Sequence, residues 1–153
     1  MNISQVYIAS DHAGYEAKMQ VKSILENMGV LVIDLGTDNA KNSVDYPDFA
    51  ALVANSIKSN DEFGVLICGS GIGISIAANR FSHIRCALGH NATIARLSRE
   101  HNDANVLCFG ARVVGAEIIK DMVEVFFTTE FSGGRHQKRV EELEKILNTK
   151  ESD

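Results

Sequence analysis

The feature that most constrains the fold is a regular alternation of short apolar segments with segments of helical spacing. Segments that are apolar throughout are typical of parallel strands buried on both faces, and the helices between them supply the crossovers. The pattern predicts one α/β domain over residues 1–153, a three-layer α/β/α sandwich with a parallel sheet of about five strands and a C-terminal helix. The expected strands are residues 6–9, 30–35, 63–68, 85–88 and 106–109, and the expected helices are 17–28, 47–58, 74–81, 92–99, 116–127 and 135–147, with residues 148–153 frayed.

Composition excludes several classes of protein. Of the 153 residues, 45% are hydrophobic and 23% are charged, which is ordinary for a packed domain. The net charge of −5 argues against nucleic-acid or anionic-membrane partners, since these attract basic proteins. We see neither a signal peptide nor an apolar run near the ~20 residues of a membrane span. We therefore expect a soluble, cytoplasmic protein.

The three cysteines form no CxxC motif, which excludes a zinc knuckle and a thioredoxin-like site. Cys86 and Cys108 lie in apolar stretches, and we interpret both as reduced thiols of the core. Cys68 differs because it ends the predicted strand 63–68. Parallel α/β sheets bind their ligands at the carboxyl ends of their strands, so position favours a functional Cys68.

A glycine-rich turn follows Cys68. Gly69, Gly71 and Gly73 occupy alternate positions, flanking Ser70 and Ile72, between a strand and a helix. Such a turn exposes backbone N–H groups at a helix N-terminus, where they bind anions and stabilise a thiolate. A simple tight turn explains the glycines equally well. The dinucleotide fingerprint fails, because the sixth position counted from Gly69 is Ile74 rather than glycine, and no P-loop motif is present.

Three further polar residues are expected at the same edge of the sheet. Asp11 and His12 follow the first strand, where they can hold a polyol and a phosphate. The simpler interpretation is a helix cap at Asp11 and a solvated His12. Arg112 follows the fifth strand and faces the same edge, unless it is an ordinary surface arginine.

Two other clusters belong to the amino-terminal edge, away from Cys68. His101 and Asn102 precede the fifth strand, and Arg135, His136 and Arg139 begin the last helix. The plain interpretation is surface loops and a solvated basic turn. However, arginines four positions apart share a helix face and suit a bidentate grip on phosphate. We hypothesise a homodimer in which these residues complete the site of a neighbouring subunit.

The remaining histidines, His83 and His90, are interpreted as structural or solvent-facing. No arrangement of histidine, cysteine or carboxylate residues matches a metal-ligand pattern. We therefore expect no bound metal.

Taken together, these motifs resemble the B-type ribose-5-phosphate isomerase family, which also holds allose-6-phosphate and galactose-6-phosphate isomerases. The resemblance covers nearly the whole chain and implies a Rossmann-like fold. It also implies a metal-free, cofactor-free aldose–ketose isomerase that forms dimers or dimers of dimers, with active sites between subunits. The residues that carry it are 10–14, 45–47, 68–80, 98–107 and 133–136.

The resemblance also implies residue roles. Cys68 would be the base that moves a proton between C2 and C1 through a cis-enediolate, which the N–H groups of residues 69–73 would stabilise. His101 would assist ring opening, with the Ser70 hydroxyl helping. One branch of the family has a glutamate base where this chain has Ile74, which leaves the cysteine mechanism. Polyol contacts would come from Asp11, Tyr46 and Asn102, and phosphate contacts from His12, Arg112, Arg135 and Arg139, with His136 nearby.

The leading functional hypothesis is interconversion of ribose 5-phosphate and ribulose 5-phosphate in the pentose phosphate pathway. A six-carbon substrate, allose or galactose 6-phosphate, is the close alternative. One chain carries both Cys68 and His101, which favours the ribose enzyme over the two-chain galactose enzymes. A phosphosugar-binding module without turnover is a further alternative, and a nucleotide-binding module is a weaker one.

Overall fold

The computed structural model describes residues 1–146. Its five strands form one parallel sheet in the order β2-β1-β3-β5-β4, which confirms the predicted parallel sheet. The end of the predicted last helix at residue 147 and the fraying of 148–153 lie outside the described residues. The strands are β1 Gln5–Ser10, β2 Val32–Asp34, β3 Glu62–Cys68, β4 Cys86–Leu88 and β5 Val106–Gly110.

The helices alternate with the strands, as the apolar spacing predicts. Pro47 lies in the first turn of its helix, where proline replaces an N–H that has no intrahelical acceptor. A short 3₁₀ helix, η1 (His12–Gly14), was not predicted. The helices are α1 Tyr15–Asn27, α2 Tyr46–Ser56, α3 Ile72–Ala78, α4 Ala92–Asn102, α5 Ala116–Phe126 and α6 Arg135–Ile146. None of them, in residues 1–146, is long and apolar enough to cross a membrane.

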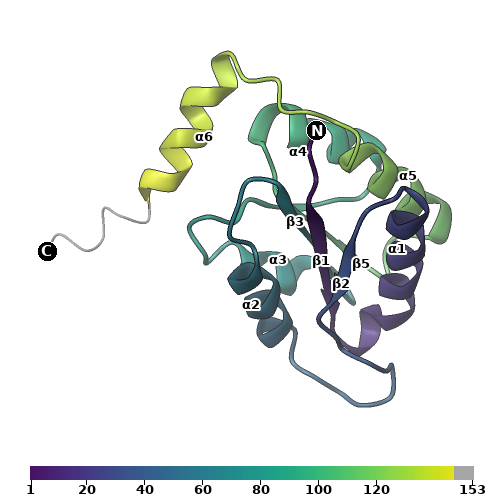
Figure 1. Ribbon diagram of the computed structural model, residues 1–153. Coiled ribbons are helices and arrows are strands. Elements are labelled where there is room, and N and C mark those ends of the chain that lie inside the picture. Colours follow the sequence, from purple (N-terminus) through teal and green to yellow (C-terminus); the bar gives the residue numbers. More distant parts are fainter. Residues whose placement is uncertain (147–153) are drawn as a thin grey trace, which may run out of the picture.

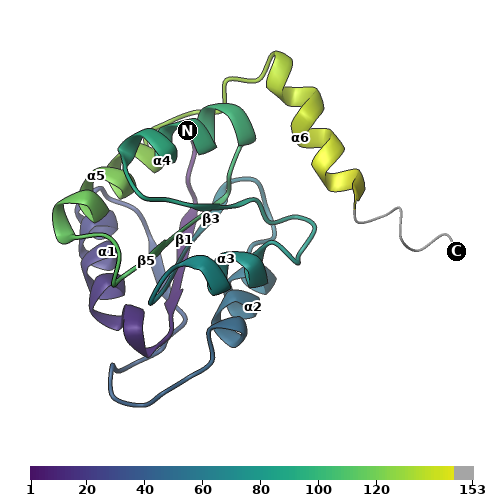
Figure 2. The same cartoon turned by 180° about the vertical axis from the view of Figure 1, so that it is seen from behind.

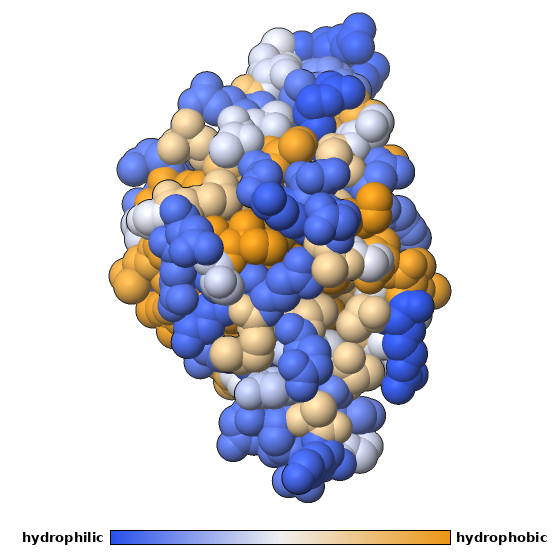
Figure 3. Space-filling view, turned by 90° about the vertical axis from the view of Figure 1, so that its right-hand side faces the viewer, coloured by the Kyte–Doolittle hydropathy of each residue, from blue (hydrophilic) through white to orange (hydrophobic). Residues whose placement is uncertain are grey.

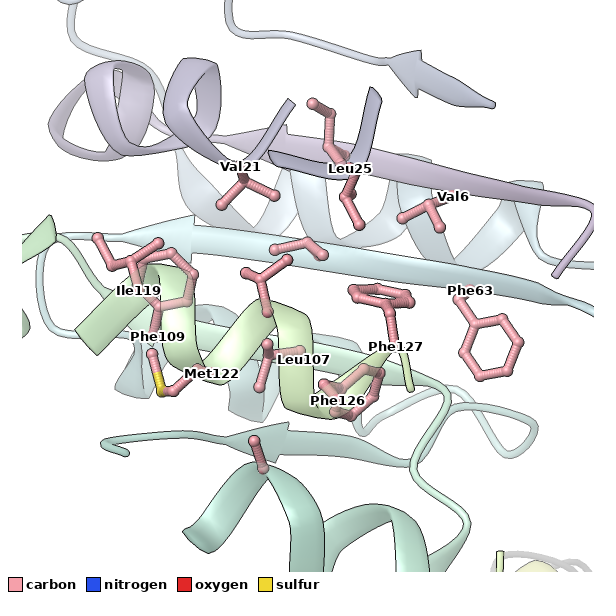
Figure 4. Packing of buried hydrophobic residues seen from close by; sticks show 14 of the residues in the cluster. Val6, Val21, Leu25, Phe63, Leu107, Phe109, Ile119, Met122, Phe126 and Phe127 are labelled. Atoms are coloured by element: carbon pink, nitrogen blue, oxygen red, sulfur yellow. The ribbon is translucent and has the colours of Figure 1, made fainter. Parts of the chain in front are cut away.

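The sheet is covered on both faces (Figures 1 and 2). Residues of α1, α4 and α5 form one apolar core with the sheet, and residues of α2 and α3 form a second core on the opposite face. In the first core, Val21 and Leu25 of α1 lie on the same face of the sheet as Phe126 and Phe127 (Figure 4). Helix α6 stands away from the layers, and Val140 is its one buried residue among those described.

The strand register aligns three chain turns at one edge of the sheet. Ser10 at the end of β1 lies opposite Ile67, and Cys68 at the end of β3 lies opposite Gly110 at the end of β5. The segments that follow these three strands therefore leave the sheet close together. Because β3 is the central strand, Cys68 lies between the other two.

Candidate active site

Cys68 is held inside the turn that joins β3 to α3. Its side chain is buried, and the Gly71 N–H donates a hydrogen bond to Sγ over 3.1 Å. The turn therefore presents a backbone donor directly to the sulfur. Helix α3 begins at Ile72, immediately after this contact, so the helix N-terminus also faces the sulfur.

Two glycines make this close packing feasible. Gly71 has a φ of +78°, and a Cβ there would lie 2.6 Å from both Leu88 Cδ1 and the Phe109 carbonyl carbon. A Cβ on Gly73 would lie 2.4 Å from Cζ of Tyr46, so the phenol ring packs directly on the turn. The glycines thus do more than allow a tight turn, because they bring Tyr46 against the Cys68 loop. Tyr46 itself remains 39% exposed.

Asp11 and His12 both make local hydrogen bonds at the same edge. Asp11 Oδ1 accepts the Gly14 N–H over 3.1 Å, so the helix cap weighed as the simpler interpretation is present. His12 is half-buried, and its Nδ1 accepts the Val44 N–H over 3.2 Å. With Nδ1 as an acceptor, the neutral ring carries its proton on Nε2 and can donate from there.

The other residues expected at this edge are exposed on it. Arg112 lies over the turn, since its Nη1 is 3.1 Å from where a Cβ of Gly69 would stand. Ser70 Oγ accepts the Ile72 N–H over 3.2 Å, and the Ile72 side chain is 55% exposed. The structure therefore brings the turn, Asp11, His12, Tyr46 and Arg112 to one edge.

The second cluster lies where α4 ends and α6 begins. The rings of His101 and His136 stack with centroids 4.3 Å apart and planes 14° apart. Partial burial lowers the pKa of His136, and His101, Arg135 and Arg139 lower it further because protonation would add a like charge. Arg135 and Arg139 are exposed on α6.

The two clusters are not brought together within one chain. Cys68 lies opposite Gly110, whereas His101 precedes Val106 at the other end of β5. Four residues of strand separate these ends, about 13 Å at 3.3 Å per residue. Within one chain, His101 and the Cys68 turn therefore belong to opposite ends of β5.

A groove of about 430 Å³ runs between α6 and the β4 side of the sheet. Asn102 is exposed and lines it, together with Arg85 of the β4 side and Leu143 and Glu144 of α6. Cys68 does not line this groove. The groove therefore belongs to the amino-terminal edge and to the surface near α6.

The remaining cysteines and histidines differ in how far they are buried. Cys108 is fully buried, and its hydrogen bond with Cys86, followed by burial, raises the pKa of the Cys86 thiol. His83 Nε2 lies 2.8 Å from the Ala54 carbonyl oxygen, while His90 is exposed. Within residues 1–146, no three histidine, cysteine or carboxylate side chains are grouped to hold a metal ion.

Two buried cations were missed in the sequence. Lys18 is 1% exposed, forms an ion pair with Asp34 and donates to the Thr37 carbonyl oxygen over 2.7 Å, which ties α1 to the segment leading to Tyr46. Arg99 is 3% exposed on α4. Helical spacing could have indicated the burial of both side chains. Lys18 lies three positions before buried Val21, and Arg99 lies four positions after buried Ala95, so each shares a helix face with a core residue.

These features define a small α/β protein with a thiol in a glycine-rich turn at the carboxyl edge of a parallel sheet. The Ribose/Galactose Isomerase family model matches residues 6–143. Ribose-5-phosphate isomerase B of Escherichia coli (strain K12) is 43% identical over 94% of this chain and 97% of its own length.

Solved structures give the same result. A ribose 5-phosphate isomerase from Thermotoga maritima superimposes with a TM-score of 0.89 and 46% identity, covering 94% of this chain and 99% of that one. Ribose-5-phosphate isomerase B from Clostridium thermocellum gives a TM-score of 0.91 and 46% identity, covering 95% of this chain and 99% of that one. The chain belongs to the Ribose/Galactose Isomerase family.

Proposed function

We propose that this chain is an aldose–ketose isomerase that interconverts ribose 5-phosphate and ribulose 5-phosphate. The observation that carries the proposal is the Cys68 thiol, set in a glycine turn with the Gly71 N–H 3.1 Å from Sγ. Relatives of similar length and fold bear the name of this activity. A place in pentose phosphate metabolism in the cytoplasm is part of the same proposal.

The proposed chemistry is a proton transfer. The Cys68 thiolate removes the proton from C2 of the open aldose, which leaves a cis-enediolate with its charge on the oxygens of C1 and C2. The thiol returns the proton to C1, the proton of the C2 hydroxyl passes to the C1 oxygen, and the product is the ketose. N–H groups of residues 69–73 are the donors proposed to stabilise the enediolate oxygens.

We place the complete site between two copies of the chain. One copy supplies Cys68, Ser70, Asp11, His12, Tyr46 and Arg112, and the second supplies His101, Asn102, Arg135, His136 and Arg139. The separation of about 13 Å within one chain supports this arrangement. His101 then assists ring opening, and the arginines hold the phosphate.

The surface beside the Cys68 turn supports a homodimer. Large hydrophobic side chains are exposed on α2 and α3, where Leu52, Ile72 and Ile76 are 47%, 55% and 52% exposed. The face that carries α1 and α5 shows hydrophilic and hydrophobic residues interspersed (Figure 3). Exposed apolar patches on a globular protein are typical of interaction surfaces.

Parallel assays of the purified protein on ribose 5-phosphate, allose 6-phosphate and galactose 6-phosphate test the substrate. We expect the largest kcat/KM with the ribose compound, and a larger value with either six-carbon sugar would assign the alternative. Incorporation of deuterium from D2O at the carbon that accepts the proton separates turnover from binding. A phosphosugar-binding module would take up no deuterium.

The role of Cys68 is tested by Cys68→Ala. We expect kcat to fall by on the order of 10²–10⁴-fold or more, because a positioned base is lost, while sugar-phosphate binding measured by calorimetry persists. Cys86→Ala is the matched control and should keep its activity, since that thiol packs in the core. Near-normal turnover of Cys68→Ala would reject the role.

The role of His101 is tested by His101→Asn with two substrates. A four-carbon aldose 4-phosphate cannot close a furanose ring, because its only available ring oxygen carries the phosphate. We expect the variant to lose much more activity with cyclic ribose 5-phosphate than with the four-carbon compound, in steady-state assays of both. Equal losses would show that His101 does not act in ring opening.

A further inference from the structure

A single buried guanidinium joins the segments that carry the second cluster. Arg99 lies in the last turns of α4, stacked near the rings of Phe63 and Phe126 at 5.2 and 5.8 Å. It is 3% exposed, which is rare for a charged group without fixed partners. The hydrogen bonds of its planar guanidinium group, whose N–H donors form a fork, therefore hold it in position.

One part of the fork closes the turn directly after His101 and Asn102. Arg99 Nη1 donates to Asp103 Oδ1 over 2.8 Å and to the Ala104 carbonyl oxygen over 2.6 Å. Asp103 has a φ of +46°, so the chain leaves α4 in a left-handed conformation at this point. The guanidinium thus fixes the residue at which α4 ends, one position beyond Asn102.

The other part of the fork reaches the segment that leads to α6. Arg99 Nε donates to the Thr129 carbonyl oxygen over 3.2 Å. A backbone hydrogen bond from Ser132 to the Glu100 carbonyl oxygen, 3.0 Å long, runs between the same two segments. The stacked rings of His101 and His136 lie just beyond these contacts.

From this geometry we infer that Arg99 is a positioning residue, which holds His101, Asn102 and the segment that leads to α6 as one unit. The inference rests on the proposed function, in which this unit completes the active site of the partner subunit. Arg99 touches neither Cys68 nor its turn in its own chain. A substitution of Arg99 should therefore alter catalysis in the active site that contains the partner's Cys68.

The test uses Arg99→Met, which keeps an unbranched apolar side chain between the two phenylalanine rings and removes the fork, and Arg99→Lys, which keeps the charge. We expect kcat/KM on ribose 5-phosphate to fall by up to about 10²-fold in both, since small displacements of catalytic groups have effects of this size. Arg96→Met, on the exposed face of the same helix, is the matched control and should stay near wild type.

The decisive measurement is a mixed dimer with two different affinity tags, one chain carrying Cys68→Ala and the other Arg99→Met. Such a dimer has one site with an intact Cys68 and an intact His101 unit, so about half of the wild-type activity should return. A merely structural defect would not be rescued, because the Arg99 variant supplies the working Cys68. The Arg99→Lys chain should behave in the same way.

A second mixed dimer, Cys68→Ala with His101→Ala, separates this inference from the proposed function. If that dimer stays inactive, the shared active site itself is wrong. If it is active while the Arg99 dimers are not, only the role of Arg99 is wrong. Wild-type activity of the Arg99 homodimers, or failure of both Arg99 variants to fold as judged by circular dichroism, would also overturn the inference.

Discussion

At the scale of single residues, the site depends on a backbone conformation that side chains oppose. Gly71 and Gly29 have nearly the same φ, +78° and +79°. A Cβ on Gly71 would meet Leu88, Phe109 and Gly110 within 2.8 Å, whereas a Cβ on Gly29 would meet nothing within 4 Å. Substitutions at the two glycines can therefore be compared. Gly29 reports the free-energy cost of a left-handed backbone alone, and Gly71 reports that cost together with the cost of close packing.

We expect Gly71→Ala to destabilise the fold by about 2–5 kcal/mol, combining roughly 1–2 for the left-handed residue with about 1–3 for overpacking. Gly29→Ala, the matched control, should lose only about 1–2 kcal/mol. Urea unfolding measures both free energies. Activity should fall in Gly71→Ala alone, because the N–H that faces Cys68 is displaced. Equal free-energy losses would contradict the steric argument.

At the scale of elements, α6 is joined to the rest of the chain by few contacts. An ion pair links Glu144 to Arg85, and the His136 ring stacks on His101. Burial lowers the pKa of His136, and so does the positive charge that a proton on its ring would add beside Arg135 and Arg139. The attachment of α6 should therefore weaken in mild acid.

The pKa of His136 lies below its ordinary value of about 6.5, so the native state resists a proton that the unfolded chain accepts. As pH falls through 6.5 toward the native pKa, the unfolded state binds more protons and stability decreases. An NMR titration should find the His136 midpoint below 6.5, and Arg135→Gln with Arg139→Gln should raise it partly, since burial is the larger cause.

His136→Gln should remove this part of the acid dependence in thermal unfolding between pH 5 and 8. The exposed His90 offers a control, because His90→Gln should leave that dependence unchanged. A His136 midpoint above 6.5 would contradict the argument, since it would mean that the stack favours the charged ring.

The elements were largely predictable because apolar runs and helical spacing dominate this sequence. The turn at Cys68 followed from its position after a buried strand. Partners distant in sequence were not predictable, since nothing local to His12 says that its ring accepts the Val44 N–H. The burial of Arg99 likewise depends on tertiary contacts.

At the scale of the whole molecule, the proposed site requires two chains. We expect light scattering to give at least twice the chain mass of 16.7 kDa, and activity per chain to fall on dilution as the dimer dissociates. Ile76→Glu on α3 should produce an inactive monomer, because a charge is costly in an apolar interface. Leu31→Glu is the control, since Leu31 is 60% exposed but lies before β2. A fully active monomer would refute the shared site.

The strand order implies that the two halves of the proposed site differ in local stability. Cys68 ends β3, which is paired on both sides by β1 and β5. Amide hydrogens of such a central strand exchange with solvent only through nearly global opening, whereas those of a lightly attached helix exchange through local fraying. Deuterium uptake should therefore be slowest along β3 and fast along α6. In each active site, a slowly exchanging strand of one subunit would face a rapidly exchanging helix of its twin, so substrate binding should change the exchange rates mainly on α6.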